Sequence, residues 1–243
     1  MHGLLLFSLV TAGALISSLT GLGGGTIILA GLLLVYPPEI AIPLHSFTQL
    51  SANSLRVALF YKTVHWRVVL FYSALMIPAC WLGAWIFDLI NPSWLKLVVG
   101  SFILVSIFPL PFKPQGEPKK ATFMILGAVS GFLGVFIGAV GPFITPFFNR
   151  LKLTRNRSIA TKNAGQAVLQ LSKIIAFWGA TSIDFGALQE NVVILVLGTL
   201  AGVGISIPLS RKISDAKFDL MINIMLGLIA VKVIYEGITE LMV

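Results

Sequence analysis

The chain has 243 residues, of which 57% are hydrophobic and only 11% are charged. A soluble domain carries roughly 25% charged residues, so this composition excludes an ordinary soluble protein. Apolar runs of roughly 20 residues, the length that spans a bilayer, recur and predict an all-α polytopic protein of the cell membrane. The formal net charge of +8 would indicate nucleic acid in a soluble protein. Here the basic residues cluster in short loops, so we expect lipid contact and no nucleic-acid partner.

The first part of the chain is an apolar segment interrupted by glycines. Residues 3–19 are predicted to form a helix that ends at residues 21–25, because adjacent glycines strongly disfavour helix. Residues 26–36 form a shorter apolar helix, which a proline pair ends. Residues 40–62 form the next helix, and Pro43 is expected in its first turn, where proline is tolerated.

The helix predicted over residues 40–62 carries a polar stripe. Its members are spaced by four, four and three residues, which places them on one helix face: His45, Gln49, Asn53 and Arg56. The neighbouring positions are mainly apolar. Polar and charged side chains inside a membrane are costly and usually functional, so the stripe predicts a substrate site.

Two further apolar segments, residues 66–88 and 93–110, are each predicted to span the membrane. Residues 111–120 read PFKPQGEPKK and are predicted to be a cytoplasmic linker, because proline and lysine are frequent there. The linker separates a first transmembrane repeat, 1–110, from a second, 121–243.

The second half repeats the order of the first. It is predicted to contain a glycine-broken helix pair, a second striped helix and two spans, over residues 121–137, 138–142 (the break), 143–148, 158–180, 187–209 and 217–239. Each repeat therefore consists of a glycine-broken helix pair and three spanning helices.

Residues of the two halves correspond at an offset of 117 positions. The corresponding pairs are Gly21/Gly138, Gly24/Gly141, His45/Lys162, Ser46/Asn163, Gln49/Gln166, Asn53/Gln170 and Arg56/Lys173. The second stripe, formed by Lys162, Gln166, Gln170 and Lys173, thus has the same spacing as the first. Matched breaks followed by matched stripes indicate two homologous halves.

Loop charges predict how the halves are oriented. One face receives twelve basic residues if each broken pair enters and leaves on the same side: Lys62, Arg67, Lys113, Lys119, Lys120, Arg150, Lys152, Arg155, Arg157, Arg211, Lys212 and Lys217. Because basic loops stay in the cytoplasm, this arrangement predicts inverted repeats with both termini outside. A re-entrant hairpin and a pair of full crossings both fit this pattern.

The sequence predicts no catalytic, metal or cofactor site. No carboxylate lies clearly mid-span, and no Ser-His pair is placed by its spacing to act as nucleophile and base. His2, His45 and His65 lack metal-ligand spacing. The single cysteine, Cys80, excludes an internal disulfide.

Helices broken inside the membrane and polar groups at a repeat interface are typical of secondary transporters. The free N–H groups of such a break, with the positive end of the following short helix, favour an anion. The candidate substrate-binding residues are Gly23, Gly24, Gly25, His45, Ser46, Gln49, Asn53, Arg56, Gly141, Lys162, Asn163, Gln166, Gln170 and Lys173. Nothing in the sequence indicates an oligomeric state.

Three motifs resemble the sulfite exporter TauE/SafE family: GLGGG at the first break, S-x-x-x-x-x-x-N from Ser46 to Asn53, and the echo GAVGP at the second break. The resemblance covers nearly the whole chain. It implies a transporter that exports or exchanges small sulfur-containing anions such as sulfite or organosulfonates. The halves differ where Gly25 is replaced by Pro142, so the site is only approximately symmetric.

Several alternatives stay open at this stage. A passive anion channel or a carboxylate transporter would use similar residues, since amide donors also suit a carboxylate. The glycines could serve helix packing alone. Arg56 and Lys173 could extend to the membrane surface instead of lining a site.

Overall fold

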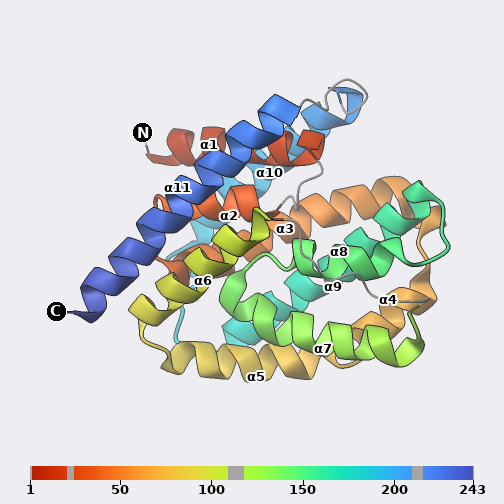
Figure 1. Cartoon of the computed structure of the whole chain (residues 1–243), viewed down its shortest axis with the longest axis horizontal. Helices are drawn as coiled ribbons and strands as arrows, with labels where there is room; N and C mark the ends of the chain where they lie inside the picture. Colours follow the sequence, from red (N-terminus) through yellow and green to blue (C-terminus); the bar gives the residue numbers. More distant parts are fainter. Residues whose placement is uncertain (1, 21–24, 109–117, 210–215, 243) are drawn as a thin grey trace.

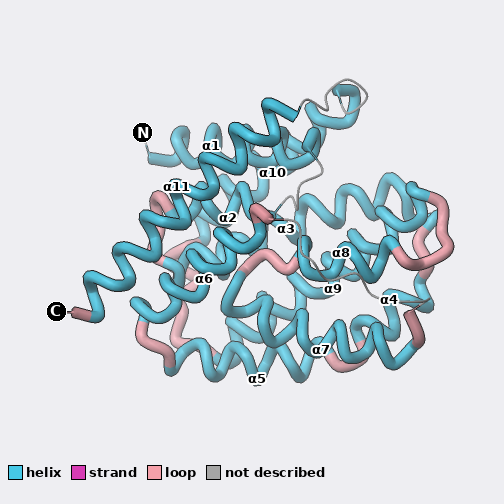
Figure 2. The backbone as a smooth tube through the Cα atoms, viewed as in Figure 1, coloured by secondary structure: helices cyan, strands magenta, loops and turns pink. Residues whose placement is uncertain are grey.

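The computed structural model describes residues 2–20, 25–108, 118–209 and 216–242, and every regular element within these ranges is helical. Figures 1 and 2 show the arrangement. The helices are α1 (His2–Thr20), α2 (Gly25–Leu33), α3 (Pro38–Phe60), α4 (Trp66–Ser73), α5 (Met76–Leu89), α6 (Pro92–Ser106), α7 (Lys120–Ile137), α8 (Gly141–Asn149), α9 (Arg155–Ala180), α10 (Gln189–Leu209) and α11 (Ala216–Leu241), with a 3-10 turn at Tyr61–Thr63. The prediction of an all-α protein is confirmed.

Four segments of the described chain are long and apolar enough to cross a membrane. They are Trp66–Leu89, Lys120–Ile137, Gln189–Ser206 and Leu220–Leu241, and the shorter apolar helices include Gly3–Ser18 and Pro92–Ser106. The fold is that of a multi-pass membrane protein.

Two prolines change details of the predicted elements. The span expected over residues 66–88 is divided into α4 and α5, because Pro78 has no N–H to donate to the carbonyl of Ala74 four residues earlier. Pro43 lies inside α3, not in its first turn as expected. The reason is that α3 begins earlier, at Pro38, the helix-initiating position that proline favours.

The helices pack mainly across the two halves of the chain. α1 lies against α10, α5 against α7, α3 against α9 and α6 against α11; α5 and α7 run side by side along the lower edge of Figure 1. At the offset of 117, the pair α1–α10 corresponds to the pair α7–α5, and α3 corresponds to α9. Each half thus supplies the packing partners of the other.

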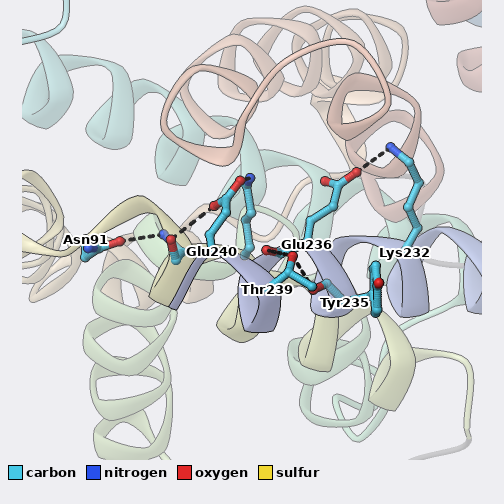
Figure 3. A network of polar contacts seen from close by, with 8 residues as sticks. Asn91, Lys232, Tyr235, Glu236, Thr239 and Glu240 are labelled. Atoms are coloured by element: carbon cyan, nitrogen blue, oxygen red, sulfur yellow. Dashed lines mark hydrogen bonds and ion pairs between the residues drawn. The ribbon is translucent and has the colours of Figure 1, made fainter. Parts of the chain in front are cut away.

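Polar contacts join one end of α6 to the end of α11 (Figure 3). The Glu240 carboxylate accepts a hydrogen bond of 3.0 Å from the Ser93 hydroxyl and forms an ion pair with Lys96. Lys232 and Glu236, one helical turn apart on α11, form an ion pair of 2.9 Å, as their spacing predicts.

The outer surface is apolar, and many polar side chains are inside. All five tryptophans are between 46% and 69% exposed: Trp66, Trp81, Trp85, Trp94 and Trp178. In contrast, the polar residues of both stripes are largely buried. This distribution fits a lipid-facing exterior around an interior that contains polar groups within an apolar core.

Candidate functional site

The second helix break is a tight turn centred on Gly138. The residue has φ 71° and ψ −57°, a backbone conformation that residues with a Cβ atom rarely adopt. The N–H of Ala139 donates to the carbonyl oxygen of Ile137 at 2.7 Å, which closes a γ-turn between α7 and α8. Helix resumes at Gly141, so the break covers residues 138–140 and is shorter than the expected 138–142.

The start of α2, which follows the first glycine cluster in the sequence, lies against the second helix break. Of the candidate residues in that cluster, Gly23 and Gly24 fall outside the described residues, whereas Gly25 begins α2. A Cβ atom placed on Gly25 would be 3.3 Å from the Cβ of Ala139, and one placed on Gly138 would be 2.8 Å from Leu29 of α2. The start of α2 and the second break therefore meet in the interior.

The two striped helices, α3 and α9, pack against each other in opposite directions. His45, near the start of α3, is close enough to Lys173, near the end of α9, to interact electrostatically. Arg56 and Lys162 interact in the same way at the opposite ends. At the offset of 117, His45 corresponds to Lys162 and Arg56 to Lys173, so each contact is the counterpart of the other.

One basic side chain of each stripe binds a carbonyl oxygen at a helix break. His45 Nε2 donates to the Gly25 carbonyl at 2.9 Å, and Lys173 Nζ donates to the Gly138 carbonyl at 3.1 Å. Since a carbonyl only accepts, the Nε2 atom of His45 carries the hydrogen, and its Nδ1 atom has no partner. Lys173 is completely buried. The alternative that its side chain extends to the membrane surface is therefore excluded for Lys173.

The other two cations of the stripes contact hydroxyl groups of the broken helices. Arg56 donates to the Ser18 hydroxyl of α1 at 2.7 Å. Lys162 donates to the Thr145 hydroxyl of α8 at 3.3 Å, and that hydroxyl donates in turn to the Gly141 carbonyl at 2.6 Å. Each cation thus ties a striped helix to one part of a broken pair.

In the described part of the chain, no carboxylate pairs with a cation of either stripe, whereas Lys96 pairs with Glu240 and Lys232 pairs with Glu236. Both of these lysines also line a pocket of about 180 Å³ between the α2–α3 turn and α11. There the positive charges are already neutralised by acids. The stripe cations lack such partners, which makes their surroundings the better site for an anion.

The remaining candidate residues are buried beside these cations. Ser46 uses its hydroxyl to donate to the Ile42 carbonyl of its own helix at 3.1 Å. The side chains of five others lie in the interior: Gln49, Asn53, Asn163, Gln166 and Gln170. Gln166 Nε2 and Gln170 Oε1 are buried without a hydrogen-bond partner. Gln166 Nε2 can therefore donate a hydrogen bond to a bound solute, and Gln170 Oε1 can accept one.

Sequence reasoning missed the groups that hold the stripe side chains. Ser18, Thr145 and the Gly138 carbonyl were not among the candidates, and neither were Tyr72 and Ser130, whose buried hydroxyls have no partner. Gly138 could have been recognised from the sequence, because it occupies the position in the second half that Gly21 occupies in the first. The hydroxyl residues had no such signal, since they lie in mainly apolar segments and belong to neither stripe.

Comparison with protein-family models gives a match over residues 5–233 to the model described as sulfite exporter TauE/SafE. Comparison with curated proteins and with solved structures gives no match. The family match spans nearly the whole chain, including both breaks and both stripes, and agrees with the resemblance of the break motifs. This family consists of membrane transporters, and it implies a sulfur-containing anion as the transported solute. The chain therefore belongs to the sulfite exporter TauE/SafE family.

Proposed function

We propose that the chain is a secondary transporter that exports or exchanges small sulfur-containing anions, namely sulfite and sulfonates such as sulfoacetate and isethionate. The anion binds between α3, α9, the start of α2 and the helix break at Gly138. One observation carries this proposal: Lys173 is completely buried, and its partner is the Gly138 carbonyl and not a carboxylate.

A buried ammonium group without a counter-ion is costly in a membrane protein. A bound oxyanion supplies the counter-ion, and its oxygens accept hydrogen bonds from the ammonium group of Lys173. His45 of α3 is close enough to Lys173 to interact with it electrostatically. The Gln49 and Asn53 side chains of α3 are also buried in the interior.

Inverted repeats would give this site access to each side of the membrane in turn. The exchange of equivalent contacts between α3 and α9, which run in opposite directions, supports that arrangement. So does the reciprocal packing of α1 on α10 and α7 on α5. In this proposal both termini face outside, and the linker at residues 111–120, most of which lies outside the described residues, faces the cytoplasm.

The membrane potential is sufficient to drive export. An inside-negative potential favours outward movement of an anion by about 2.3 kcal/mol per charge per 100 mV. The described acidic residues lie in loops or near helix ends, so none is placed as a mid-membrane proton relay. Uniport or anion exchange therefore fits better than proton coupling.

Counterflow of labelled sulfite in proteoliposomes tests the proposal. We expect saturable exchange for the unaltered protein and, for Lys173→Met, a rise in KM of about tenfold or more, because charged hydrogen bonds contribute about 1.5–3 kcal/mol. Methionine keeps an unbranched chain of similar length. Lys232→Met is the matched control, because Lys232 is half exposed and paired with Glu236.

Two outcomes would contradict the proposal. Non-saturable flux would indicate a passive channel, and an unchanged KM for Lys173→Met would remove Lys173 from the site. A panel of sulfite, sulfoacetate, isethionate and acetate separates a sulfur-anion transporter from a carboxylate transporter. Size-exclusion elution and thermal unfolding in detergent establish that each variant is folded.

A further inference from the structure

A second group of polar atoms is buried at the junction of α4, α7 and α9, where the sequence predicts no complete site. Tyr72 of α4 lies between the other two helices. A Cβ atom placed on Gly165 of α9 would be only 2.8 Å from the Tyr72 ring, and one placed on Gly127 of α7 would collide with the Tyr72 carbonyl. The ring also packs edge-on against Phe148 at 5.5 Å. These contacts hold the side chain in one place.

The hydroxyl of Tyr72 is adjacent to the side chains of Ser130 and Gln166. Tyr72 and Ser130 are completely buried, and Gln166 is 8% exposed. The Tyr72 hydroxyl interacts with both of these side chains, yet Tyr72 Oη, Ser130 Oγ and Gln166 Nε2 each lack a partner at the distance and angle of a regular hydrogen bond. Three polar atoms from three helices therefore meet in the interior without fully satisfying one another.

Buried polar groups are almost always hydrogen-bonded, because leaving one unpaired costs free energy. Three unpaired groups at one point indicate that a polar guest completes them. All three groups are able to donate a hydrogen bond, and none carries a charge. The complementary guest is a group with several acceptor oxygens, such as the trioxo group of sulfite or of a sulfonate.

The position of this cluster relates it to the charged site. Gln166 precedes Lys173 by seven residues on α9, which is about 10 Å along the helix. Gln170 lies between them on the same stripe, and its Oε1 atom is also buried and unpaired. Polar groups thus continue along α9 from the cluster to Lys173, through an interior that is otherwise largely apolar.

We propose that Tyr72, Ser130 and Gln166 form an uncharged oxyanion subsite, separate from Lys173, which holds the transported anion by hydrogen bonds alone. This inference rests on the proposed function, since it assumes that a sulfur-containing oxyanion enters the interior. Its new elements are Tyr72 and Ser130 as residues that bind the anion.

Tyr72→Phe and Ser130→Ala test the subsite by sulfite counterflow in proteoliposomes. Each variant removes one donor and hardly changes shape, so we expect KM to rise about tenfold, with a larger rise for sulfite than for acetate, which has two oxygens. Tyr235→Phe on α11 and Ser101→Ala on α6 remove the same groups from exposed positions and should leave KM unchanged.

Thermal unfolding of the same variants excludes a merely structural role. Without substrate, Tyr72→Phe should be as stable as the unaltered protein or more stable, because it removes an unpaired buried hydroxyl. With sulfite present, the stabilising shift in Tm should be smaller than for the unaltered protein. An unchanged KM would mean that the cluster holds only water, and a lower Tm without substrate would mean a structural hydroxyl. Either result overturns the subsite while saturable transport by the unaltered protein still supports the proposed function.

Discussion

The ammonium group of Lys173 donates to the carbonyl oxygen of Gly138 at 3.1 Å, across 35 positions of the chain. This hydrogen bond joins the second polar stripe to the second helix break. The carbonyl is free to accept because the γ-turn at Gly138 interrupts the helical hydrogen bonds of α7. The conformation of one glycine and the placement of one buried cation therefore depend on each other.

Gly138→Ala should destabilise the protein by about 1–3 kcal/mol, the usual cost of a non-glycine residue in an unfavourable backbone region. The new methyl group would also meet the Leu29 side chain at 2.8 Å. Thermal unfolding in detergent measures the effect. Gly204→Ala in α10 is the matched control, because its Cβ has no neighbour within 4 Å and alanine favours helix. Equal stability of the two variants would contradict the strained turn.

Arg56 and Lys162 should act on the anion together, because they interact with each other and have no acidic partner in the described structure. Arg56→Met and Lys162→Met are each expected to raise KM for sulfite. The double variant should deviate from the sum of the single effects by about 0.5–3 kcal/mol, the range measured for residues in contact. Strict additivity would show that the two cations serve independent purposes.

The contact of Lys96 with Glu240 should contribute little to stability, because the Glu240 side chain is exposed and salt screens such pairs. Glu240→Gln is expected to lower Tm slightly in dilute buffer and not at all in 1 M NaCl. Sulfite KM should stay unchanged at both salt concentrations. A salt-independent loss of stability would mean that this end of α11 is anchored mainly by the hydrogen bond from Ser93.

The predicted topology places the loop before α9 in the cytoplasm and the loop before α10 outside. In a Cys80→Ala background, Arg155→Cys should react with a membrane-impermeant thiol reagent only after the cells are opened. Glu190→Cys should react in intact cells. Labelling of position 155 in sealed cells would contradict the proposed topology. If position 155 were labelled in intact cells and position 190 only in opened cells, the protein would have the opposite orientation in the membrane.

The break at Gly138 and the two stripes could be predicted because they are local features of the sequence. Helical spacing places His45 and Arg56 on one face, and the echo at Lys162 and Lys173 follows from the 117-residue offset. These patterns depend only on the period of a helix and on the effect of glycine. The structure accordingly places both stripes in the interior.

Contacts between helices could not be predicted in the same way. Tyr72, Ser130 and Gln166 are separated by 58 and 36 positions, and no periodicity within one helix relates them. Only the packing of α4 between α7 and α9 brings their polar atoms together. The division of the span at residues 66–88 could not be predicted for a different reason. The continuous apolar run predicts a single spanning helix, and one proline near its middle does not change its hydropathy.

The packing of α1 on α10 has a consequence for synthesis of the chain. The Thr11 hydroxyl donates to the Gly198 carbonyl at 3.1 Å, and close approach of the helices there requires a residue without a side chain. α10 begins at Gln189, 169 residues after α1 ends at Thr20. At roughly 5–20 residues per second, a ribosome takes about 10 to 30 s to cover that distance. During this time the side of α1 that packs on α10 lacks its partner. The equivalent packing of α7 on α5 involves no such delay, because α5 has already been made.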